Sequence, residues 1–129
     1  MKIEVSNGEV LDKYSILQIK SERITDPTAL KNVRRELESL QPAVDEIRSK
    51  ESSDAISTLQ DQLLEVNTQL WEVGDLLRGL EKSQDFSASF VAAARSVYQL
   101  NDRRSAVKKE INLLTGSSLV EEKSYEKYD

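Results

Sequence analysis

The chain has 129 residues, of which 32% are charged and 5% aromatic, with four glycines and two prolines, a balance typical of a helical domain. Its net charge of -5 argues against general nucleic-acid binding, which needs a clustered basic face. The absence of cysteine and histidine excludes disulfides, thiol or histidine catalysis and the usual zinc ligands, and no metal or other cofactor is expected.

The first predicted helix follows a short segment, residues 1–5, in which apolar and polar residues alternate. Ser6 and Glu9 have the spacing of a capping box, which predicts a helix from about Asn7 to Ile24. Ile16 and Ile19 lie toward the other side of this helix from its main apolar face, so the helix is expected to contact more than one neighbour.

The second predicted helix begins at Pro27, with Asp26 as its cap. Its apolar residues recur every three or four positions through Ile47. Pro42 lacks an amide donor and clashes with the preceding turn, which predicts a kink or break near Leu40.

Two long helices are predicted next, over about residues 55–82 and 86–115. A three-residue connection, 83–85, makes them antiparallel neighbours, and Gly116 suits the position that ends the second one. Each carries one apolar stripe, which is best buried by helix packing. The stripe contains Ile56, Leu59, Leu63, Val66, Leu70, Val73, Leu77 and Leu80, then Phe90, Ala93, Val97, Leu100, Val107, Ile111 and Leu114.

These elements predict an all-α antiparallel bundle built on a long hairpin, with two shorter N-terminal helices. Residues 1–116 are expected to form a single domain and residues 117–129 a charged tail. No apolar run approaches membrane-spanning length and no signal-peptide core is present, so a cytoplasmic protein that does not bind membranes is expected.

The apolar faces are wider than a two-stranded coiled coil requires, which favours further helix contacts and self-association. We expect a homodimer, or docking on another protein. The residues expected at this interface lie on the first helix and on the outer rows of the two long ones: Ile16, Ile19, Leu64, Trp71, Val91 and Tyr98.

Arg104 interrupts the stripe at the level of Val66 and Asn67, where a guanidinium needs a carboxylate or a bound anion. One reading is a structural ion pair, with Asp12, Glu22 or Glu36 as the acid. The other is a site for a small anionic ligand. Its candidate residues are Arg104, Arg95, Arg23, Asn101 and Asn67.

Several stretches resemble an uncharacterised family of small helical proteins from bacteria and their phages. They are residues 3–9, 11–13, 16–20 and 22–24 near the N-terminus, then 94–98, 101–104, 108–117 and 121–125. The resemblance covers nearly the whole chain. It implies a single short domain and brings no established activity.

The stretch from Leu11 to Arg23 is also similar, more weakly, to the first helix of the all-helical chorismate mutases. That similarity implies a site in which arginines grip a dicarboxylate, with Arg23, Arg95 and Arg104 as counterparts by residue type only.

The leading hypothesis is therefore a non-enzymatic helical interaction or assembly module. The alternative is a bundle with a small anionic-ligand site around Arg104, either a binder or a mutase-like enzyme.

Overall fold

The computed structural model describes residues 1–50 and 53–128, and it is all-α over this part of the chain. Its helices are α1 (Asn7–Arg23), α2 (Pro27–Ser49), α3 (Ser53–Lys82) and α4 (Ala88–Leu114). The predicted bounds agree with these to within two residues. The predicted fold class, a helical bundle built on a long hairpin, is confirmed.

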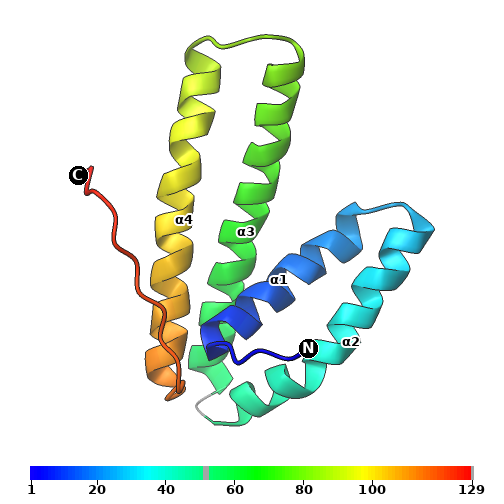
Figure 1. Ribbon diagram of the computed structural model, residues 1–129, viewed down its shortest axis with the longest axis vertical. Coiled ribbons are helices and arrows are strands. Elements are labelled where there is room, and N and C mark those ends of the chain that lie inside the picture. The colour runs from blue at the N-terminus through cyan, green and yellow to red at the C-terminus, as the bar shows by residue number, and fades with distance from the viewer. Residues whose placement is uncertain (51–52, 129) are drawn as a thin grey trace.

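Helices α3 and α4 run antiparallel and form the most extensive helix pair in the structure (Figure 1). Helix α1 crosses the base of this hairpin, the end opposite the 83–87 connection, and contacts both α3 and α4. Helix α2 packs chiefly against α1 and makes few contacts with α3. The upper part of the hairpin extends beyond both shorter helices.

The capping residues predicted at the start of α2 and at the end of α4 form the expected hydrogen bonds. The Asp26 carboxylate accepts a hydrogen bond from the Ala29 amide at 2.8 Å, and Pro27 occupies the first turn of α2. Gly116 takes a positive φ of 63°, and the Ser117 amide donates to the Asn112 carbonyl at 2.9 Å, which closes α4 with a Schellman-type cap.

Helix α2 does not break near Leu40. It continues through Pro42 to Ser49, and its course curves in that region (Figure 1). A proline removes a single helical hydrogen bond, and burial of Val44 and Ile47 against the core holds the following turns in place. Of the two predicted outcomes, a kink or a break, the break does not occur, because packing of the following turns keeps the helix continuous while its course bends.

The hydrophobic core lies at the base of the hairpin, where all four helices meet. Ile56, Leu63 and Ile111 have no exposed surface, and Leu11 of α1 and Val44 of α2 are nearly as deeply buried. None of the described helices is long and apolar enough to cross a membrane.

Burial falls along the apolar stripe toward the free end of the hairpin. We call residues 70–82 of α3 and 88–97 of α4 the distal half. In the distal half only Ala93 is buried, and the other stripe residues keep part of their surface in solvent. The stripe is thus covered at the base by α1 and left open above it. Its half-buried members there are Leu70, Val73, Leu77, Leu80, Phe90 and Val97.

Candidate functional site

The first turn of α1 is locked onto α4. Ser6 caps α1 by accepting a hydrogen bond from the Glu9 amide at 3.2 Å, as the capping box predicts. The Glu9 carboxylate pairs with Lys108 of α4 rather than completing the box. The Gly8 amide donates to Asn112 Oδ1 at 2.6 Å, and a Cβ at Gly8 would lie 2.5 Å from the Lys108 carbonyl oxygen. Only glycine allows the two backbones to approach this closely.

One turn further along α1, a buried carboxylate faces Arg104. Asp12 has no exposed surface, and Arg104 Nε donates to its two carboxylate oxygens at 2.9 and 3.1 Å. Arg104 Nη2 also donates to Oδ2. Asn67 Nδ2 of α3 donates to Oδ1 at 2.8 Å and to Ser15 Oγ at 2.7 Å. The carboxylate therefore ties α1 to α3 and α4 at one level.

The charge of this cluster is balanced within the chain. The Lys108 side chain is 15% exposed and lies between Glu9, Asp12 at 4.0 Å and Glu121 at 3.6 Å. The hydrogen bond from Arg104 to Asp12 raises the pKa of Arg104 above its ordinary value, opposed by burial. We name Glu9, Asp12, Asn67, Arg104 and Lys108 the Asp12 cluster.

The segment after Gly116 runs along α4 (Figure 1) and adds to these contacts. Glu121 accepts a hydrogen bond from Ser6 Oγ at 3.0 Å, and Glu122 pairs with Lys109 at 3.1 Å. Tyr128 donates to Asp102 and lies edge-on to Tyr98, with ring centroids 4.9 Å apart. Lys108 and Lys109 of α4 are thus both paired with glutamates.

Of the five candidate residues of an anion site, Arg104 and Asn67 come together on Asp12, and the other three lie apart from them. Asp12 occupies the position beside Arg104 that a ligand carboxylate would need, and its negative charge would oppose a second anion there. Arg23 lies three turns further along α1 and pairs with Glu72 at 3.2 Å. Arg95 is exposed and nine residues from Arg104, about 13 Å along the helix axis. Asn101 is half-buried on α4, and Asn67 belongs to the Asp12 cluster.

The candidate interface residues differ widely in exposure. Ile19 is 4% exposed within its own chain and is not accessible to a partner, and Ile16 is half-buried. Leu64 lies beside α1 and α2, Trp71 is half-buried, and Tyr98 is covered in part by Tyr128. Val91, in the distal half, keeps 52% of its surface exposed.

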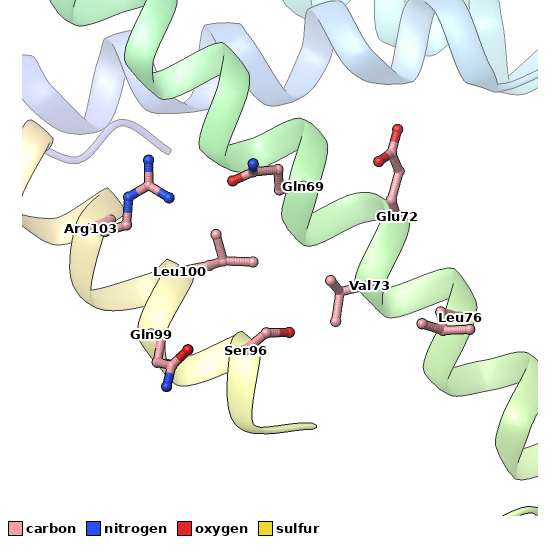
Figure 2. A pocket seen from close by; sticks show the side chains of 8 residues that line it. All are labelled: Gln69, Glu72, Val73, Leu76, Ser96, Gln99, Leu100 and Arg103. Atoms are coloured by element: carbon pink, nitrogen blue, oxygen red, sulfur yellow. The ribbon is translucent and has the colours of Figure 1, made fainter. Parts of the chain in front are cut away.

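A concave surface does lie between the two long helices. A pocket of about 470 Å³ opens along the α3–α4 seam, and Gln69 and Val73 of α3 and Ser96 and Leu100 of α4 point into the space between the two helices (Figure 2). A second pocket of about 370 Å³ follows toward the base, and Arg103 lines both. We call the two together the seam groove. Its lining residues are Gln62, Glu65, Val66, Gln69, Glu72, Val73, Leu76, Ser96, Gln99, Leu100, Arg103, Ala106 and Val107.

Sequence reasoning overlooked Gly8, Asn112 and Arg103. Gly8 stands within the predicted cap and gave no signal of close helix approach. Arg103 is adjacent to Arg104 in the sequence. The placement of α1 makes them differ, because Arg104 binds Asp12 of α1 whereas Arg103 lines the groove. Within residues 1–50 and 53–128 there is no group of three or more acidic side chains suited to a metal ion.

These features define a class of protein: a four-helix bundle whose long hairpin is clamped to α1 by a saturated polar cluster and carries an open groove along its seam. The chain belongs to a family of unknown function, DUF6165, whose model matches residues 1–128. No curated protein and no solved structure gave a match.

Proposed function

We propose that this protein is a non-enzymatic assembly module that forms a homodimer through the uncovered part of its hairpin. The observation that carries the proposal is the change in burial along one stripe. Ile56, Leu63 and Val66 are at most 1% exposed at the base, whereas Leu70, Val73 and Leu77 of the same stripe are only half-buried in the distal half. Two helices alone do not bury such a stripe, and a second layer of helices does.

The Asp12 cluster supports a structural role over a catalytic one. Every oxygen of the Asp12 carboxylate already accepts hydrogen bonds from Arg104 or Asn67, and Lys108 is surrounded by acids. A carboxylate saturated in this way has no free position for a substrate. Its geometry instead fixes where α1 crosses the hairpin, and so which part of the stripe stays open.

Light scattering coupled to size-exclusion chromatography tests the dimer. We expect a mass of about twice 14.6 kDa at micromolar concentrations. Replacing Leu76, which is 53% exposed in the seam groove, by serine should shift the mass toward the monomer. The matched control is Leu113→Ser, since Leu113 is 67% exposed on α4 but lies outside the groove. A wild-type protein that stays monomeric up to about 100 µM contradicts the proposal.

A further inference from the structure

The seam groove lies on the face of the hairpin that turns away from α1. Asn67 and Arg104 both bind Asp12, so they mark the face that α1 covers. At 3.6 residues per turn, Glu65, Gln69 and Glu72 point about 140–160° away from Asn67 around α3. Helix α1 lies in front of the hairpin in Figure 1 and behind α3 in Figure 2, which looks into the groove. The groove therefore faces away from α1 except at its rim, where Arg23 of α1 pairs with Glu72.

The groove has the shape and length of a binding site for another helix. Its apolar lining that keeps surface in solvent comes from Val73 and Leu76 of α3 and Val107 of α4, and the other two apolar lining residues, Val66 and Leu100, are buried. From Gln62 to Leu76 it follows α3 for about 21 Å, or four helical turns. Such a seam between antiparallel helices is filled in bundles by the side chains of a further helix.

Charges along the two rims are opposite in sign. The α3 rim carries Glu65 and Glu72, of which Glu72 already pairs with Arg23 of α1, and the α4 rim carries Arg103. Within the part of the chain that the structure describes, Arg103 and Glu65 form no ion pair. Gln69 lines the groove together with Arg103, and its Oε1 is buried without a hydrogen-bond partner among the described residues. A partner must therefore present a basic group to one rim and an acidic group to the other, as a second copy of this hairpin does.

The opposite charges of the two rims also lie at the same level along the hairpin. Asn67 and Arg104 stand at one level because both reach Asp12, so Arg103 is level with about position 68 of the antiparallel α3. That level is midway between Glu65 and Glu72. When a second copy is rotated by 180° about an axis parallel to the helices, its α4 lies against α3 of the first copy. This rotation does not move any residue along the helix axis, so each residue keeps its level. Its Arg103 then meets the acidic rim, and symmetry repeats the contact on the other side.

We infer that two copies of the protein pack groove to groove, each α3 against the partner's α4, with Arg103 of each copy seated between Glu65 and Glu72 of the other. The four long helices then form one bundle, with the α1–α2 arms on its two outer faces. The inference rests on the proposed function and adds to it the face, the register and the charged contacts of the dimer.

Charge reversal tests this arrangement with two variants. Each variant alone should dimerise weakly, and a mixture of the two should dimerise well. Arg103→Glu should weaken the dimer by about tenfold or more, because the change acts twice across a two-fold interface, and Glu65→Arg/Glu72→Arg should do the same. An equimolar mixture of the two should form heterodimers with near wild-type affinity, since both of its contacts pair opposite charges. Arg34→Glu, at an exposed position of α2, is the matched control and should dimerise normally.

A second measurement does not depend on charge. Because the chain has no cysteine, Glu65→Cys and Ala106→Cys can be made separately, mixed and oxidised. The two positions stand at one level, so the arrangement predicts 65–106 cross-linked heterodimers in high yield. Circular dichroism of each variant checks that the fold is retained.

The outcomes separate the two claims. A monomeric wild type overturns the proposed function, and this inference with it. If the wild type is a stable dimer, three results overturn only the groove-to-groove arrangement. They are an Arg103→Glu variant that dimerises as tightly as the wild type, a mixture of the two charge-reversal variants that forms no heterodimer, and the absence of a 65–106 cross-link.

Discussion

Replacing Asp12 by alanine should lower the free energy of unfolding by about 3 kcal/mol, the lower end of the range for breaking a buried ion pair, because Arg104 keeps some access to water. Its side chain is 29% exposed, whereas Asp12 is fully buried. The substitution also removes the acceptor for Asn67 and leaves Lys108 with one neighbouring acid fewer. For a chain of this size the loss corresponds to roughly 10 °C in Tm, measured by thermal denaturation at a fixed protein concentration.

Two comparisons show whether the loss comes from the ion pair. Lys13 and Glu36 form an exposed pair at 3.6 Å, so Glu36→Ala should cost less than about 0.5 kcal/mol. In the double variant Asp12→Ala/Arg104→Ala, the loss should be smaller than the sum of the two single losses, because the second substitution removes the group that the first left unpaired. Strictly additive losses would show that the two residues act independently, contrary to the structure.

Replacing Gly8 by alanine should destabilise the protein by about 2–3 kcal/mol, since one methyl group forces apart two closely packed backbones. The new Cβ would stand 2.5 Å from the Lys108 carbonyl oxygen and 3.0 Å from Asn112 Oδ1. The first turn of α1 must then move away from α4, which lengthens the hydrogen bond from the Gly8 amide to Asn112. Urea denaturation measures the change.

A second helical glycine provides the matched control. A Cβ at Gly79, in α3, would meet no atom within 4 Å. Gly79→Ala should therefore stabilise the protein by about 0.5–1 kcal/mol, through the higher helix propensity of alanine and the smaller entropy of its unfolded chain. If both substitutions shift stability in the same direction by similar amounts, close packing at Gly8 is not the cause.

The sequence by itself determined the helices, because the signals that define them are local. Apolar residues every three or four positions, a proline after Asp26 and a glycine after Thr115 act within one or two turns of chain, and the structure has helices that begin and end there. The short connection between the long helices was enough to make them an antiparallel hairpin. At Pro42 the local signal allowed either a kink or a break, and packing of the residues after it keeps the helix continuous.

The tertiary structure alone decided what each polar residue meets and which part of the stripe is covered. Three acids were equally suited to face Arg104, and only the crossing of α1 over the hairpin selects Asp12 and sends Glu36 to Lys13 at the surface. The apolar spacing of α3 is the same at Leu63 as at Leu77, yet the first is fully buried and the second is partly exposed. Periodicity states which face of a helix is apolar. How far along the helix a neighbour covers that face depends on where distant segments of the chain cross, and no local pattern encodes the crossing.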